Sequence, residues 1–188
     1  MGYFPDNIVR VEYVLATLAN YKDQPENVLN AVRQEAIQKL GELAISISQE
    51  IQRVADRYQI TINRAQLLTS IATITGSLTT IVSSAIPTNQ GSDNQDVDTT
   101  KKAQAKVQIV NTVGTVLTVL SGALAAVSSR NSIKAQTELQ TLQLKLQQVQ
   151  NAIASIQQNQ GSPDASSSSK WLIGGIVFAL VLIASKRS

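Results

Sequence analysis

Residues 32–65 read VRQEAIQKLGELAISISQEIQRVADRYQITINRA, and this stretch decides the fold. Its apolar residues recur at spacings of 4, 4 and 3, a repeat of eleven residues. An eleven-residue repeat keeps packed helices nearly straight or winds them slightly to the right. The series predicts a long helix with a partner helix, because an ordinary amphipathic helix on a small core explains far fewer turns. The predicted seam residues are Val32, Leu40, Leu43, Ile47, Ile51 and Val54.

A second series occupies residues 135–156, where apolar residues alternate at spacings of 4 and 3. This heptad pattern is typical of a left-handed coiled coil. Its seam residues are Leu139, Leu142, Leu146, Val149, Ile153 and Ile156. The other positions are dominated by glutamine, with few charges to select a partner. They include Gln136, Gln140, Gln143, Gln147 and Gln150.

Two charge-free runs lie between these series, at residues 65–86 and 107–129. Both are long enough to span a bilayer, but nine Ser or Thr residues weaken the case for insertion of the first. Three alternatives stay open for this apolar hairpin: permanent insertion, burial inside an oligomer, or insertion after a soluble stage. Permanent insertion conflicts with a C-terminal crossing, because the basic tail would then lie opposite to the positive-inside preference.

The C-terminal sequence predicts a membrane anchor that follows a flexible linker. Residues 171–185 are fifteen uncharged residues after a Ser-rich linker. A helix of that length covers about 22 Å, which is short for a hydrocarbon core of roughly 30 Å. The predicted anchor residues are Trp171, Leu172, Ile173, Ile176, Val177, Phe178, Leu180, Val181, Leu182, Ile183, Lys186 and Arg187. The two basic residues place the C-terminus on the cytoplasmic-type side; the alternative is a buried C-terminal helix.

Together these patterns predict an all-α fold, an elongated helical hairpin or coiled coil with a C-terminal transmembrane helix. The predicted segments are a short amphipathic helix (1–22), a hendecad helix running into an apolar segment (23–87), a polar loop (88–106), an apolar helix continuing into a Gln-rich heptad coiled coil (107–160), a linker (161–170) and the anchor with its basic tail (171–188).

Composition excludes most catalytic chemistry. The chain has no Cys and no His, which removes thiolate nucleophiles, the commonest general base and the commonest metal ligand. The acidic residues near Asp93 lack the spaced glycine and distal Glu of a calcium loop. We therefore expect no enzymatic activity, no cofactor, no metal and no small-molecule substrate.

Charge is distributed unevenly along the chain. Residues 1–100 carry seven Lys/Arg and eleven Asp/Glu, whereas residues 101–188 carry nine and two. Such asymmetry is typical of contact with nucleic acid or anionic lipid, or of basic residues that flank membrane segments.

Long helices with hendecads and heptads, a Gln-rich face and a membrane segment resemble the DNA pilot proteins of small bacteriophages. The pattern is also similar to membrane-associated virion proteins of phages with an internal lipid layer. The resemblance implies a homo-oligomeric tube that delivers a genome across a membrane. It also implies that the five glutamines line a polar lumen, with only non-specific contact to nucleic acid.

Two further functions stay open. An α-helical pore-forming protein has long helices flanking an apolar hairpin that inserts on assembly, and a membrane-tethered coiled-coil scaffold requires nothing more than the seams and the anchor. All three functions predict a membrane-associated chain, in a virion or in a host membrane.

Overall fold

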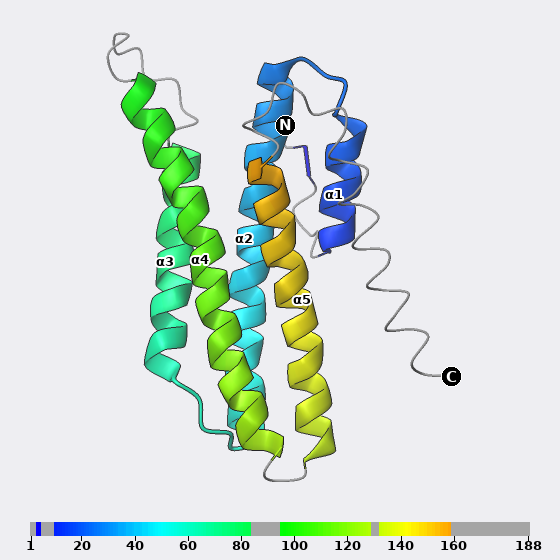
Figure 1. Ribbon diagram of the computed structural model, residues 1–188, viewed down its shortest axis with the longest axis vertical. Coiled ribbons are helices and arrows are strands. Elements are labelled where there is room, and N and C mark those ends of the chain that lie inside the picture. Colours follow the sequence, from blue (N-terminus) through cyan, green and yellow to red (C-terminus); the bar gives the residue numbers. More distant parts are fainter. Residues whose placement is uncertain (1–2, 5–9, 84–94, 129–131, 159–188) are drawn as a thin grey trace. The chain divides into compact units, whose positions relative to one another are not determined.

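The computed structural model describes residues 3–4, 10–83, 95–128 and 132–158, and it confirms the all-α prediction (Figure 1). These residues form five helices and no strand. The helices are α1 (Val11–Asn20), α2 (Glu26–Arg57), α3 (Arg64–Ser83), α4 (Gln95–Ser128) and α5 (Ile133–Gln158). The chain separates into two units, Met1–Ile153 and Ala154–Ser188. The first unit contains α1 to α4 and most of α5.

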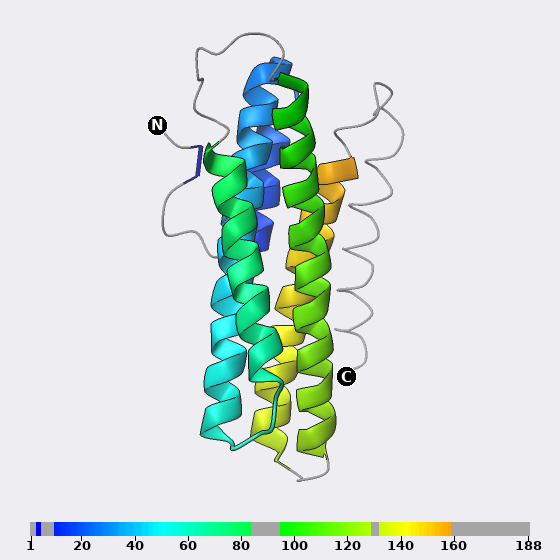
Figure 2. The same ribbon diagram turned by 90° about the vertical axis from the view of Figure 1, so that its left-hand side faces the viewer.

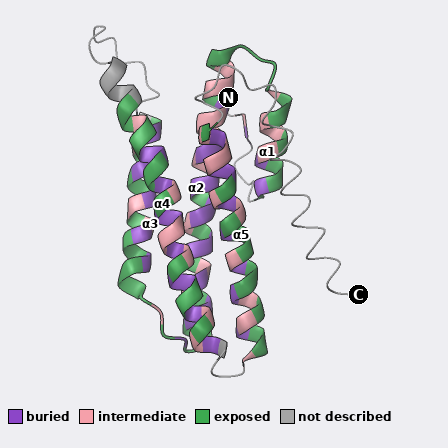
Figure 3. Ribbon diagram, in the orientation of Figure 1, coloured by how far each residue is buried: buried purple, intermediate pink, exposed green. Residues whose placement is uncertain are grey.

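Within the first unit, the four long helices lie side by side and alternate in direction, as Figures 1 and 2 show from two sides. Helix α3 packs against both α2 and α4, and α1 packs against α2. Each long helix turns a buried face toward its neighbours (Figure 3). The core is aliphatic, and its large, fully buried side chains include Ile37, Leu40, Ile51, Leu67, Ile74, Ile81, Ile109, Leu120, Leu139, Leu146 and Ile153.

The predicted hendecad helix does not run on into the apolar segment, because α2 ends at Arg57 and the chain reverses before α3. Gln59 adopts a positive φ of 53°. The Ile60 amide then donates to the Ala55 carbonyl at 2.8 Å, which ends α2 with a left-handed C-terminal cap. Asn63 caps the next helix, since its Oδ1 accepts from the Gln66 amide at 3.1 Å. The apolar series of α2 therefore ends at Val54, and its partner helices come from the same chain.

The predicted polar loop and the predicted helix over residues 107–160 also differ from the structure. Helix α4 begins at Gln95, inside the expected loop, because residues 92–106 contain no Gly or Pro to oppose helix formation. Helices α4 and α5 are separate, ending at Ser128 and beginning at Ile133. Residues 128–132 (SSRNS) contain no apolar side chain to continue a buried seam, and Ser and Asn favour helix ends over helix interiors.

The N-terminal segment is held on α2 by one carboxylate. Glu35 accepts the Tyr3 amide at 2.8 Å and the Phe4 amide at 2.9 Å, one on each oxygen. Phe4 is buried, and the Tyr3 ring meets Tyr21 edge to face with centroids 5.4 Å apart. The segment thereby covers the side of α2 where α1 also packs. The predicted helix within residues 1–22 is α1, which begins at Val11.

Candidate functional site

Helices α3 and α4 form a hairpin with two stretches that, among the described residues, are long and apolar enough to cross a membrane, Arg64–Val82 and Thr100–Val127. In the best window of each stretch, only 33% and 39% of the residues are buried. The core helix of a water-soluble protein passes the same test of length and composition, but most of such a helix is buried. The hairpin therefore exposes more of its apolar sequence than a core hairpin does.

Beyond Arg64 at its start, the outward face of α3 carries no charged residue. One row of exposed positions follows spacings of 4, 3, 4 and 3, and consists of Ala65, Thr69, Ala72, Gly76 and Thr79. Leu68 and Val82 lie beside them, 53% and 45% exposed. A helix face that only meets water usually carries charged side chains. Helix α2 follows that rule, since its exposed positions include Glu42, Arg53 and Asp56.

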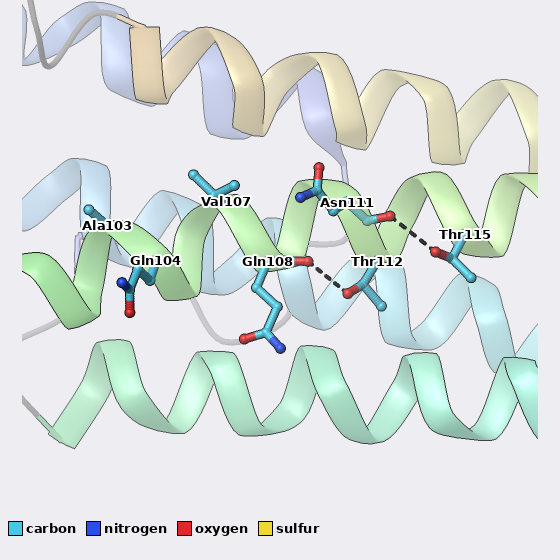
Figure 4. Close-up of a pocket in the computed structure, with 7 residues that line it drawn as sticks. All are labelled: Ala103, Gln104, Val107, Gln108, Asn111, Thr112 and Thr115. Carbon is cyan, nitrogen blue, oxygen red and sulfur yellow. Dashed lines mark hydrogen bonds between the residues drawn. The ribbon is translucent and has the colours of Figure 1, made fainter.

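The outward face of α4 is equally free of charge beyond Lys106. It exposes Val107, Asn111, Thr118, Gly122 and Ala125. A shallow groove of about 540 Å³ lies along its first half (Figure 4). The groove is lined by Ala103, Gln104, Val107, Gln108, Asn111, Thr112 and Thr115. Its lining side chains are amides, hydroxyls and small apolar groups, none of them ionisable.

Several hydroxyl groups on the hairpin donate to backbone carbonyls within their own helices. On α3, the Thr75 hydroxyl donates to the Ile71 carbonyl at 2.9 Å, and Thr79 donates to Thr75 at 3.0 Å. On α4, Thr118 donates to Gly114 at 3.2 Å and Ser121 to Leu117 at 2.9 Å. A hydroxyl that already donates to a backbone carbonyl loses less on leaving water. The Ser and Thr content therefore opposes insertion less than the sequence alone indicates.

Helices α3 and α4 also share one polar contact. The Ser77 hydroxyl donates to Gln108 Oε1 at 3.1 Å, and Figure 4 shows Gln108 reaching toward α3. Such a contact between helices remains favourable in lipid, where water does not compete for the donor. The hairpin thus has its own connection, separate from its contacts to α2 and α5.

Helix α2 covers the inner side of the hairpin at a very close approach. A Cβ atom on Gly41 would lie 2.7 Å from Leu78 Cδ2, so only glycine fits there without movement. Helix α5 contacts α4 through a long side chain, since Gln150 Nε2 donates to the Val110 carbonyl at 3.4 Å. A Cβ on Gly114 would lie 3.2 Å from the same nitrogen.

Helices α2 and α5 are joined by Glu138. Its carboxylate accepts Arg57 Nη1 at 3.0 Å and the Tyr58 hydroxyl at 2.9 Å. The hydrogen bond to this carboxylate, with smaller contributions from burial and from its negative charge, raises the pKa of Tyr58 above its ordinary value. This link ties the C-terminal end of α2 to the first turns of α5.

The structure buries both predicted seams. On α2, Val32, Leu40, Leu43, Ile47, Ile51 and Val54 are all buried. On α5, the buried seam residues are Leu139, Leu142, Leu146, Val149, Ile153 and Ile156. The sequence therefore identified the inward faces of both helices.

The five predicted lumen glutamines do not share one environment. Gln140 and Gln147 are exposed, whereas Gln136, Gln143 and Gln150 are half-buried. Gln150 contacts the backbone of α4 in the same chain. The predicted anchor residues between Trp171 and Arg187 lie outside the described residues.

Three structural features were not predicted from the sequence. These are the helix break at Gln59, the carboxylate of Glu35 under the N-terminal amides, and the link through Glu138. The sequence signal for the helix break was the pair Asn63 and Gln66, because Asn followed three residues later by Gln is typical of the start of a helix. Over the described parts of the chain, no group of three or more acidic, His or Cys side chains is arranged to hold a metal ion. In comparisons with known proteins, no family model, curated protein or solved structure matches this chain.

Proposed function

We propose that this protein is a membrane-tethered helical protein whose α3–α4 hairpin enters a lipid bilayer, in the manner of an α-helical pore-forming protein. The observation that carries the proposal is the outward surface of the hairpin. It is free of charge over residues 65–82 of α3 and 107–127 of α4, and the hydroxyls described above donate within their own helices. A length of 18 helical residues covers about 27 Å, close to the hydrocarbon core of roughly 30 Å.

Insertion requires the hairpin to separate from α2. Helix α2 packs along α3 and carries Glu42, Glu50 and Arg53 on exposed or half-buried positions, which makes it unsuitable for lipid. The described arrangement is thus the state before insertion in this proposal, with α2 and α5 covering the inner side of the hairpin. This corresponds to insertion after a soluble stage among the alternatives left open by the sequence.

The C-terminal segment and the coiled-coil seams are further parts of the proposal. Residues 171–184 would hold the chain at the membrane, and the Ser-rich linker would leave the helices free to move. Tethering raises the local concentration of the hairpin at the bilayer. Delivery of a phage genome rests on the resemblance alone and stays a prediction, which the presence of the protein in purified particles would support.

Leakage of a dye from lipid vesicles tests the proposal. The full chain should release the dye, and Ala72→Lys combined with Thr118→Lys should abolish release by placing two charges on the lipid-facing surface. Gln49→Lys adds a charge to the exposed face of α2 and should leave release unchanged. Ile74 and Val116 are unsuitable positions, because both are buried and a charge there would unfold the bundle. Equal leakage from the double variant and the wild type would contradict the proposal.

A further inference from the structure

Helix α5 contains two heptad series on opposite faces. The inner series is the buried seam described above, which begins at Ala135. The outer series is offset by two residues, has the same spacings of 4 and 3, and is exposed at all six positions. We call it the outer stripe; it consists of Ile133, Thr137, Gln140, Leu144, Gln147 and Asn151.

The composition of the outer stripe differs from that of a face that only meets water. It contains no charged residue, and its two large aliphatic residues, Ile133 and Leu144, are 77% and 47% exposed. The charged residues of α5 (Lys134, Glu138 and Lys145) all lie beside the stripe. The outward face of α2, by contrast, exposes Glu42, Arg53 and Asp56. Two exposed aliphatic residues and four uncharged polar residues at heptad spacing form a face that another helix can cover without burying a charge.

We propose that the outer stripe binds the outer stripe of a second copy of this chain, with the two α5 helices parallel. The chemistry of the stripe is self-complementary. Each Gln or Asn amide carries a donor and an acceptor, so an identical side chain opposite it can satisfy both. In a parallel pair, Ile133 and Leu144 each meet their own copy in an apolar layer. Gln140, Gln147 and Asn151 form amide layers, which fix the register because a slipped pairing would place amides against aliphatic side chains.

An antiparallel pair lacks this match. In the antiparallel register that aligns the ends of the stripe, Ile133 would oppose Asn151 and Leu144 would oppose Gln140. Each apolar side chain would then cover an amide and leave it without a partner.

The contacts that α5 makes with the other described residues leave the stripe exposed. The inner seam packs within the chain, Glu138 binds Arg57 and Tyr58, and Gln150 binds the backbone of α4. None of these residues belongs to the outer stripe. Two copies can therefore associate without unfolding the first unit, and the association does not depend on insertion of the hairpin.

Disulfide cross-linking of the full chain in solution, without lipid vesicles, tests the pairing. The chain has no native Cys, so single substitutions report single positions. Ile133→Cys and Asn151→Cys should each form a symmetric disulfide dimer. Each should react about tenfold or more faster than Gln49→Cys, a control at an exposed position of α2, because a paired stripe holds the two thiols at high effective concentration. Leu144→Lys, added to either variant, should remove the excess rate, and Gln49→Lys should not.

Two results would overturn the proposal. One is cross-linking of the stripe variants at the rate of Gln49→Cys. The other is a mixed disulfide between Ile133→Cys and Asn151→Cys chains that forms faster than either symmetric one, which would show an antiparallel pair. Loss of dye leakage with intact cross-linking would contradict only the proposed function, so the two proposals fail separately.

Discussion

Gln59 is the single residue that turns a predicted long helix into two. It occupies the left-handed region of backbone conformation, which β-branched residues adopt only at considerable cost. We predict that Gln59→Val lowers the free energy of unfolding by about 1–2 kcal/mol, whereas Gln59→Gly keeps the cap and costs little. Urea unfolding followed by circular dichroism would measure both. Equal stability of the two variants would show that the positive φ is not maintained in solution.

Glycines in the long helices should respond to substitution according to their neighbours. Gly76 and Gly122 have no neighbouring atom within 4 Å of an added Cβ, so changing either to Ala should stabilise its helix by about 1 kcal/mol. Gly41→Ala should lose that gain, because the Cβ would meet Leu78 at 2.7 Å. Thermal unfolding of the three variants checks this ordering. A gain at Gly41 as large as the other two would mean that α2 and α3 do not approach as closely as described.

Tyr58 makes the link between α2 and α5 dependent on pH. Since its pKa in the fold is raised above 10.0 by the hydrogen bond to Glu138, the link contributes stability below that pH. The contribution is lost as pH rises through the raised pKa, when the hydroxyl becomes a phenolate beside a carboxylate. Glu138→Gln should bring the pKa of Tyr58 back toward 10.0. Absorbance titration of the phenolate, with Tyr58→Phe subtracted, measures the change; an unaltered titration would exclude the link.

At the scale of helices, the sequence identified faces better than ends. Every predicted seam residue of α2 and α5 is buried, because an apolar repeat records which side of a helix avoids water. The ends were missed where they depend on backbone conformation or on distant contacts. Neither feature leaves a periodic signal in the sequence. One is the positive φ of Gln59. The other is the contact of Glu138 with Arg57 and Tyr58, which lie 81 and 80 positions earlier in the chain.

The hairpin was the element whose role the sequence could not decide. Its apolar length was visible, but the sequence did not show that only one side is covered or that several of its hydroxyls donate within their own helix. These two facts depend on packing and side-chain orientation.

One prediction at this scale concerns helix α2, which covers the inner side of the hairpin. Leu78→Ala removes the side chain that fills the space at Gly41, and should loosen α2 from α3 and speed dye leakage from vesicles. Leu68→Ala removes a leucine from the exposed face of α3 and serves as the control, with no acceleration expected. Leakage that responds equally to both changes would count against release of α2 as the step that frees the hairpin.

At the scale of the first unit, charge separates the surfaces. The outward faces of α3, α4 and α5 are largely uncharged, and α2 exposes acidic and basic residues to water. In the proposal, α3 and α4 meet lipid and the outer stripe of α5 meets a second copy. The all-α class could be predicted from periodicity, whereas this division of surfaces required the packing of one helix on another.

The measurement that tests insertion of the hairpin most directly is the environment of a dye on each face. The absence of native Cys allows an environment-sensitive fluorophore to be attached at Ala72→Cys on α3, Thr118→Cys on α4 or Gln49→Cys on α2, all three exposed positions. Binding to vesicles through the C-terminal segment alone would leave all three dyes in water. Insertion of the hairpin predicts that the dyes at 72 and 118 move into an apolar environment while the dye at 49 does not. Vesicle-bound protein with all three dyes still in water would contradict it.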